Sequence, residues 1–504
     1  MPTVLDLDDV YNEIGGFGFY QFVLIILRQW LALTMSANSF IFFSLNNIPS
    51  KVTCEFPGYF NVTDQCAIRQ NCSKPIVHTP FYSFKEEFGL FCDKEWIAAL
   101  IMSLTTMCGV VIILSGYLAD RIGRKPILVF GYATSVLAGF VAASSNSWVM
   151  LLVSMIVQGL SFGFYHMCAS VLLTELVTKK YRSVIACAGQ WCFMYMINAA
   201  VGYITGYWST FLYTMNVVAL PLVFIHMWFL VESPRWSIQN GYFDRAASGM
   251  NFIAWVNRVQ LKEAITPERL AKFRTTKGKV YTPIDLFRTK KIAKHTVLQM
   301  CKTPVNYIGI SVIVWNVGAL VGNPFVQIAL YGALRLWAPF LVIWLDWKAP
   351  KIGRRWTLLS TLALIIICYI SLTIIFAIDK QIEWKLAVTI FSQFGALLIV
   401  SLFWITFEIY NTELFPTVMR IIAGSMTDLV GLIGASITPY LLLLGRSWAP
   451  APYLVVSVIA VFSWCLDFAF LPETHGKPLI ESVEEVQHIT EMKPKSYDDS
   501  GNLK

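Results

Sequence analysis

Charged residues are scarce in this chain, and their scarcity excludes an ordinary water-soluble domain. Of its 504 residues, 14% are charged and 56% are hydrophobic, whereas a soluble domain carries about a quarter charged residues. The sequence also lacks a nucleophile elbow, a P-loop and a metal-ligand cluster. An enzyme and a nucleotide-driven pump are therefore not expected, and neither a cofactor nor a metal is predicted.

A basic leader is missing as well. The first 17 residues contain four carboxylates (Asp6, Asp8, Asp9 and Glu13) and no lysine or arginine. A cleavable signal peptide needs a basic region before its apolar core, so we expect the first apolar span to direct membrane insertion.

Apolar runs of roughly 20 residues, enough to cross a bilayer, recur along the chain. They are too long and too uniformly apolar for barrel strands, so helices are predicted. Twelve spans are expected, at Gly18–Phe43, Trp96–Leu118, Pro126–Ala143, Val149–Leu173, Ser183–Tyr207, Phe211–Val231, Thr303–Val321, Pro324–Leu345, Trp356–Ile378, Leu386–Ile409, Ile421–Leu444 and Tyr453–Phe470. The fold class is an all-α membrane protein with both termini on one side.

Three charged markers occur twice, in the same order, about half a chain apart. Because each copy follows an apolar stretch, the repeat indicates two similar halves, that is, two pseudo-symmetric six-helix bundles. The pairs are Gly116–Lys125 (GYLADRIGRK) and Asp346–Arg355 (DWKAPKIGRR), Glu175 with Arg182 and Glu413 with Arg420, and Glu232–Arg235 and Pro472–Thr474.

The distribution of basic residues predicts the orientation. Short loops after the second, fourth, eighth and tenth spans contain eleven lysines and arginines, against three in the short loops of the opposite side. The positive-inside rule therefore places the first group, and both termini, in the cytoplasm. The net charge of +8 reflects these loops, and no nucleic-acid partner is predicted.

The long loop between the first two spans, residues 45–95, falls on the opposite, outer side. It contains Cys54, Cys66, Cys72 and Cys92 and the two glycosylation sequons at Asn61 and Asn71. Four cysteines in an oxidising compartment predict two disulfides with three open connectivities. Chance is the alternative for each sequon.

Domain limits follow from these patterns. We predict an N-terminal bundle at 1–235, a basic cytoplasmic linker at 236–295, a C-terminal bundle at 296–475 and a disordered tail at 476–504. The linker pattern allows short amphipathic helices along the membrane surface.

The markers carry a family resemblance that covers nearly the whole chain. GYLADRIGRK resembles the loop motif of the major facilitator superfamily. Glu232–Trp236 (ESPRW), Thr412–Arg420 (TELFPTVMR) and Leu471–Leu479 (LPETHGKPL), together with the long cysteine-bearing outer loop, resemble the organic cation, organic anion and carnitine transporter family. The resemblance implies the major facilitator fold and a plasma-membrane carrier of small organic ions that works by alternating access.

The charges at the cytoplasmic helix ends are predicted to form an inner gate. Asp120 can pair with Arg124 and face the positive end of a helix in the other half, and pairing of Glu175 with Arg182 and of Glu232 with Arg235 is expected to extend the network. The alternative is that the basic residues only set topology. The predicted gate residues are Asp120, Arg121, Arg124, Glu175, Arg182, Glu232, Arg235, Asp346, Arg354, Glu413 and Arg420.

Ionisable residues inside spans are costly and are candidates for the binding site. Arg28, His166, Arg335 and Asp428 are such residues, with Glu408 nearer the cytoplasm. Trp315 and Tyr331 offer aromatic faces to a cation. The alternatives are an internal ion pair for Asp428 with an arginine, and a neutral packing role for His166 and most aromatic residues.

The family's charge pattern transfers poorly, because Leu432 stands where cation carriers place an acid and Arg335 lies in span eight. A cation, a zwitterion and an anion all stay open as substrates, and no coupling ion is indicated. The rival readings are a sugar or polyol porter, and a receptor-like or vesicle protein that kept the fold without transport.

Overall fold

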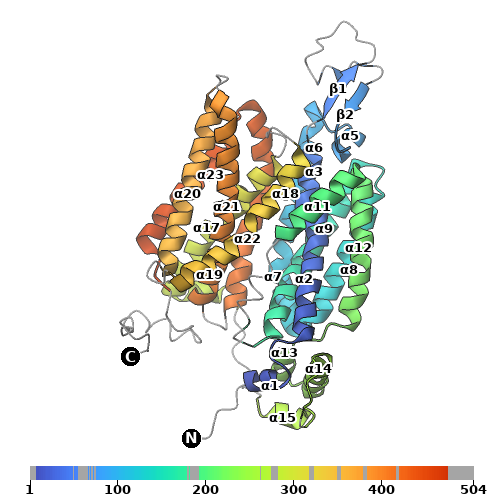
Figure 1. The fold of residues 1–504 in the computed structure, drawn as a ribbon, viewed down its shortest axis with the longest axis vertical. Helices are drawn as coiled ribbons and strands as arrows, with labels where there is room; N and C mark the ends of the chain where they lie inside the picture. Colours follow the sequence, from blue (N-terminus) through green and yellow to red (C-terminus); the bar gives the residue numbers. More distant parts are fainter. Residues whose placement is uncertain are drawn as a thin grey trace.

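The computed structural model describes residues 7–48, 50–54, 66, 68–69, 72, 75–178, 181, 192–261, 263–273, 282–316, 323–348, 353–378, 383–415 and 419–474. These residues form two helical bundles side by side, joined by linker helices at one end and topped by a small sheet at the other (Figure 1).

The N-terminal bundle contains the first six predicted spans. Its first span is continuous from α2 through a π-helical turn to α3, and its second runs through two 3-10 turns. The bounds are α2 Phe19–Ser36, η1 Ala37–Ile41 and α3 Phe42–Asn46; η2 Cys92–Lys94, α6 Glu95–Cys108, η3 Gly109–Val111 and α7 Ile112–Ile122; α8 Arg124–Ala143; α9 Trp148–Glu175; α11 Cys192–Thr205; and α12 Trp208–Trp228.

The C-terminal bundle repeats this plan, with its second span divided into α18 and α19. The bounds are α17 Lys290–Trp315, α18 Pro324–Arg335, α19 Ala338–Lys348, α20 Gly353–Ala377, α21 Glu383–Leu414, α22 Arg420–Ser447 and α23 Ala451–Phe470. Across the described residues, eleven helical runs are long and apolar enough to span a membrane, and the shorter α11 lies at the predicted fifth span.

Local sequence signals set several helix starts. Ser147 accepts a hydrogen bond from the Met150 amide at 3.3 Å and caps α9. Asn323 accepts one from the Phe325 amide at 3.0 Å, just before Pro324 at the first position of α18. A short polar side chain satisfies an amide that the helix itself leaves unpaired, and proline lacks one there.

One end of the bundles, here called the loop face, carries the segment between the first two spans. Strands β1 (Lys51–Cys54) and β2 (Pro75–His78) pair antiparallel, with Lys51 opposite His78, and helix α5 (Phe84–Glu87) follows. The predicted two disulfides are present, and their connectivity is Cys54–Cys72 and Cys66–Cys92.

The opposite end, here called the linker face, carries helices α1 (Leu7–Glu13), α13 (Pro234–Gln239), α14 (Phe243–Val256) and α15 (Pro267–Ala271); α16 (Asp285–Arg288) precedes α17. Asn257 fixes α14 to the start of α2. Its side chain accepts from the Tyr20 amide at 2.8 Å and donates to the Ile14 carbonyl at 2.9 Å. Helices α1, α13, α14 and α15 therefore pack as part of the N-terminal bundle, whereas α16 packs on α17 of the C-terminal bundle.

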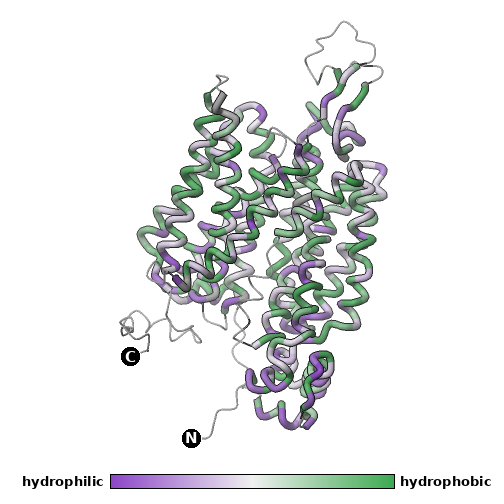
Figure 2. The backbone as a smooth tube through the Cα atoms, in the orientation of Figure 1, coloured by the Kyte–Doolittle hydropathy of each residue, from purple (hydrophilic) through white to green (hydrophobic). Residues whose placement is uncertain are grey.

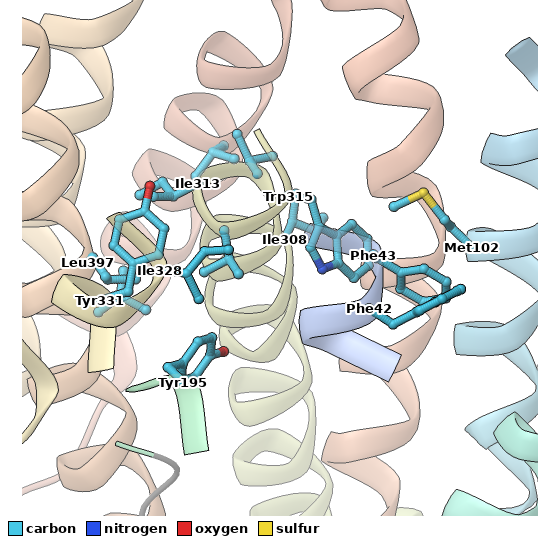
Figure 3. Close-up of a cluster of buried hydrophobic side chains, with 14 of the residues drawn as sticks. Phe42, Phe43, Met102, Tyr195, Ile308, Ile313, Trp315, Ile328, Tyr331 and Leu397 are labelled. Carbon is cyan, nitrogen blue, oxygen red and sulfur yellow. The ribbon is translucent and has the colours of Figure 1, made fainter. Parts of the chain in front are cut away.

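Two apolar clusters hold the molecule together. One runs through the C-terminal bundle and into the loop-face half of the N-terminal bundle, and it includes Phe43, Tyr195, Trp315 and Tyr331 (Figure 3). The other joins the N-terminal bundle to α1, α14 and α15. Figure 2 shows hydrophobic residues along the bundles and hydrophilic ones concentrated in the linker helices.

Candidate functional site

The first charged marker forms a compact corner at the linker face of the N-terminal bundle. The Arg124 guanidinium lies 2.9 Å from Asp120 and 3.3 Å from Glu175. Glu232, at the end of the sixth span, accepts from the amides of Arg124 at 3.0 Å and Lys125 at 3.2 Å. A carboxylate at the N-terminus of α8 satisfies unpaired amides and complements the helix dipole.

The second marker forms the same corner in the C-terminal bundle. Glu473 accepts from the amides of Arg354 at 2.9 Å and Arg355 at 3.1 Å, at the start of α20. The Arg354 guanidinium lies 3.5 Å from Glu413, and Glu413 also accepts from the Thr474 hydroxyl at 2.7 Å. The two corners confirm that the charged markers are structural repeats.

Glycine is required in both corners. Gly123 has φ of +116° and Gly353 has φ of +66°. A Cβ at Gly123 would lie 2.4 Å from a carboxylate oxygen of Glu232, and a Cβ at Gly353 would lie 2.3 Å from one of Glu473. Both the left-handed backbone and the close carboxylate demand a residue without a side chain.

The predicted gate pairs are only partly those found. Asp120 pairs with Arg124 as expected, but Glu232 binds backbone amides rather than Arg235, because helix N-terminal amides lie closer. Arg235 instead pairs with Asp8 and lies 4.9 Å from the Tyr11 ring. Arg121 is exposed over the Tyr117 ring.

Arg420 donates to the Phe415 carbonyl at 3.5 Å. Arg182, Asn61 and Asn71 lie outside the described residues, as does the side chain of Asp346. Each described gate pair lies within one bundle, so the gating role stays a prediction.

Four of the ionisable residues within the spans come together between the bundles. Arg28 and His166 belong to the N-terminal bundle, and Glu408 and Asp428 belong to the C-terminal bundle. Each lies about 9–14 Å from the linker-face end of its helix at 1.5 Å per residue. Arg28 interacts electrostatically with both His166 and Glu408, and Glu408 with Asp428. We call this set, with Tyr307, the ionisable layer.

Tyr307 and two aromatic rings complete the layer. The Tyr307 hydroxyl donates to Asp428 at 3.2 Å, and its ring packs against Trp404 with centroids 5.2 Å apart. On the other side, His166 stacks on Phe162 at 4.9 Å. Glu408 is exposed and Arg28, His166 and Asp428 are only half-buried, so the charged groups of this layer are not sealed inside packed helices.

Above the layer, towards the loop face, lies a small central cavity lined by both bundles. Its volume of about 30 Å³ holds little more than a water molecule. Phe162 and Leu432 line it one turn from His166 and Asp428, so it adjoins the layer. The remaining lining residues are Met35, Asn38, Ser39, Phe43, Thr105, Thr106, Gln158, Gly159, Tyr165 and Trp315.

The other predicted site residues lie apart from the layer. Trp315 reaches the central cavity and packs edge-on against Phe43 at 5.7 Å. Tyr331 is fully buried in the apolar cluster that also contains Phe43, Tyr195 and Trp315 (Figure 3). Arg335 is buried where α18 packs on α11, with its guanidinium 5.7 Å from the Tyr195 ring.

Sequence reasoning missed two charge pairs. Lys302 and Asp467 form a fully buried pair at 3.2 Å between α17 and α23, and Glu95 pairs with Arg446 across the two bundles at the loop face. Lys302 stands just before a predicted span and Asp467 close to the end of another. Each therefore looked like a residue at the membrane–water interface. Only Asp467 could have been recognised from the sequence, because an acidic residue within an apolar run needs a partner of opposite charge.

Two pseudo-symmetric bundles with charged side chains between them define a membrane carrier. The family described as "Sugar (and other) transporter" matches residues 81–486. The chain belongs to this family of the major facilitator superfamily.

The curated relatives that match most of the chain include organic cation and carnitine transporters. The human solute carrier family 22 member 2 is 28% identical over 428 residues, covering 82% of this chain and 73% of the relative. The Drosophila melanogaster organic cation transporter protein is 26% identical over 439 residues (83% and 77%). The human organic cation/carnitine transporter 2 is 26% identical over 419 residues (81% and 72%).

Solved structures support the fold. The inward-open xylose transporter XylE of E. coli superimposes with a TM-score of 0.63 at 16% identity, covering 93% of this chain and 98% of that chain. At 16% identity, this similarity supports the fold but not a shared substrate. The expected fold class and family are confirmed, and so is the expectation of a transporter rather than an enzyme. The protein is a multi-pass membrane protein that takes a small-molecule substrate.

Proposed function

We propose that the protein carries small organic ions across the plasma membrane by alternating access, with the linker face in the cytoplasm. The single observation that carries this proposal is the ionisable layer, in which side chains of both bundles face one another. Names of relatives such as the organic cation/carnitine transporter 2 support an organic ion as substrate. Sugar sites rely mainly on neutral polar groups, whereas most members of this layer are ionisable.

The balance of charge favours a substrate with a cationic group. The layer contains two carboxyl groups, Glu408 and Asp428, and one arginine, Arg28, so it has one acidic group more than it has arginines. A cationic group near Asp428 offsets that surplus. An anionic group on the same substrate would meet Arg28, so a zwitterion also fits.

The positions at which the bundles touch support alternating access. The central cavity is too small for an organic ion, while the described ion pair between bundles, Glu95–Arg446, lies at the loop face. Substrate entry from that face therefore requires this contact to open.

On the linker face, Asp120→Asn should lower uptake at normal surface density. Unchanged uptake would show that Asp120 is not part of the gate.

Uptake in expressing cells tests the proposal. The panel is labelled tetraethylammonium, a carnitine-like betaine, an aromatic carboxylate and a hexose. Asp428→Asn should lower uptake of the cation by about ten- to hundredfold, the value of one charge-assisted contact. Glu263→Gln, an exposed linker carboxylate, is the matched control and should leave uptake unchanged.

The rivals have their own outcomes. Hexose uptake that Asp428→Asn does not alter would favour the sugar porter, whose support is the family description itself. No uptake of any compound at normal surface density would favour a protein that kept the fold without transport.

A further inference from the structure

A second and much larger cavity lies at the loop face, away from the ionisable layer. Its volume is about 510 Å³, within the range of small-molecule sites. Its walls come from three parts of the chain: the disulfide-bonded loop, the N-terminal bundle and the C-terminal bundle. We call it the loop-face cavity.

The cavity combines apolar walls with a few charged groups. Met102, Trp315 and Phe376 are among the apolar side chains, and the first two are drawn in Figure 3. The charged residues that line it are Arg69, Lys85, Glu95 and Arg446. A largely apolar pocket with a small number of fixed polar groups is typical of binding sites for small organic molecules.

Two of the cations already have carboxylate partners. Arg69 binds Glu86 through two hydrogen bonds of 2.6 and 2.7 Å and stacks over Phe91 at 3.6 Å. Arg446 pairs with Glu95. These pairs leave their neighbourhood near neutral.

Lys85 is the surplus cation. Only 7% of it is exposed, and its ammonium group donates to the Asn47 amide oxygen. No carboxylate lies within ion-pair distance of it among the described residues. A buried ammonium without an anion is costly, and an anion in the cavity would offset that cost.

We propose that the loop-face cavity is a binding site for an organic monoanion, with the carboxylate at Lys85 and an apolar body against Met102 and Phe376. The site is separate from the ionisable layer and does not depend on the transported substrate. Because its walls include Glu95 and Arg446, its occupant binds the conformation in which the bundles touch at the loop face. Such a ligand acts as an inhibitor of loop-face opening.

The pKa of Lys85 gives the site a pH signature. Burial lowers this pKa to about 8; the charges facing the ammonium are Glu95 on α6, Arg446 on α22 and Glu86 on its own helix, and of these Arg446 lowers the pKa further while the two carboxylates raise it. The ammonium is therefore charged at pH 7 and mostly neutral at pH 9.5. An anion that needs this charge should bind about ten- to thirtyfold more weakly at the higher pH.

Titration calorimetry on the purified full-length protein tests the proposal, with benzoate as the probe and benzamide as its uncharged counterpart. We expect benzoate to bind at pH 7, to weaken about tenfold or more by pH 9.5, and benzamide not to bind comparably. Lys85→Met should abolish benzoate binding. Lys85→Arg should retain it and remove the pH dependence, because arginine stays charged.

Matched controls locate the site. Lys94→Met removes an exposed lysine of the same loop that does not line the cavity and should leave the benzoate affinity unchanged. If Lys85→Met and Lys85→Arg both bind as the parent does, or if Arg28→Met alone abolishes binding, the anion lies in the ionisable layer and the proposal is overturned. Loss of organic-ion uptake in Asp428→Asn with benzoate affinity intact would separate this site from the transport site.

Discussion

Breaking the Lys302–Asp467 pair should destabilise the protein more than any exposed ion pair does. The two charged groups lie 3.2 Å apart, with side-chain exposures of 0% and 1%, and the ammonium lies 5.1 Å from the Tyr410 ring. Asp467→Asn leaves an uncompensated ammonium inside the C-terminal bundle. Removing one partner of a buried pair costs about 3–5 kcal/mol.

A loss of that size lowers the Tm by roughly 3–5 °C if the whole chain unfolds as one unit and by roughly 6–20 °C if the C-terminal bundle unfolds alone. The assay is thermal unfolding of purified protein, followed by tryptophan fluorescence. The double variant Lys302→Met/Asp467→Leu buries no charge at all, so it should unfold at or above the parent's Tm. Surface expression and uptake should follow the same order.

An exposed pair provides the control. Arg269 and Glu13 lie 2.6 Å apart with side-chain exposures of 34% and 46%, and Arg269→Met should change stability by less than about 1 kcal/mol. If Asp467→Asn and the double variant are equally unstable, the cost comes from lost packing rather than from an unpaired charge. The reasoning would then be refuted.

Three further predictions concern other parts of the molecule. Gly353→Ala should lower the free energy of unfolding by about 1–3 kcal/mol, because Gly353 has a φ of +66° and lies against the Glu473 carboxylate; surface expression and Tm should both fall. Gly206→Ala is the control: Gly206 has a φ of +62° but open space around it, so the substitution should cost less. Lys85→Met should raise the Tm at pH 7. The folded-state pKa of Lys85, about 8, lies below its usual 10.5, so its destabilising effect is full below pH 8 and fades as pH rises towards 10.5; an advantage of Lys85→Met that persists above that pH would contradict this cause. Replacing Cys54 and Cys72 together with alanine should lower the free energy of unfolding by about 3 kcal/mol, because the bridge closes a loop of 18 residues. The measurement is the Tm without reducing agent; with reducing agent, which also opens Cys66–Cys92, the variant and the parent should unfold at similar temperatures.

Repetition made the fold predictable. Gly116–Lys125 and Asp346–Arg355 are recognisable because charged residues are rare in an apolar chain, and each copy marks the same turn between two spans. Most spans predicted from apolar length agree with the described helices to within several residues. The seventh does not: it was predicted to begin at Thr303, but α17 begins at Lys290, because the helix continues through a basic and polar segment that apolar length does not register. The π-helical turn Ala37–Ile41 and the division between α18 and α19 were not predicted. Polar residues occur at both places (Asn38 and Ser39, and Arg335), but a polar residue within an apolar run does not by itself specify a change in helix geometry.

The candidate site was predictable as a set of residues but not as an arrangement. The energetic cost of an ionisable side chain within a membrane span singled out Arg28, His166 and Asp428. The apolar pattern does not, however, determine how each helix is rotated about its axis, and so which way these side chains face. Only packing shows that these three meet while Arg335 lies elsewhere. The disulfide connectivity needed the structure for the same reason, since spacing allows three pairings.

The corners at Glu232 and Glu473 have a mechanical consequence. Each carboxylate comes from the end of the sixth span of its bundle and holds the first amides of the third. The third and sixth spans of each bundle are thereby tied together at the linker face, and the third span cannot tilt away from the sixth without losing two charge-assisted hydrogen bonds. The contact resists relative movement of these two spans. In the proposed transport cycle, each bundle should therefore move as a unit, and the change should occur at the boundary between bundles, where the ionisable layer lies.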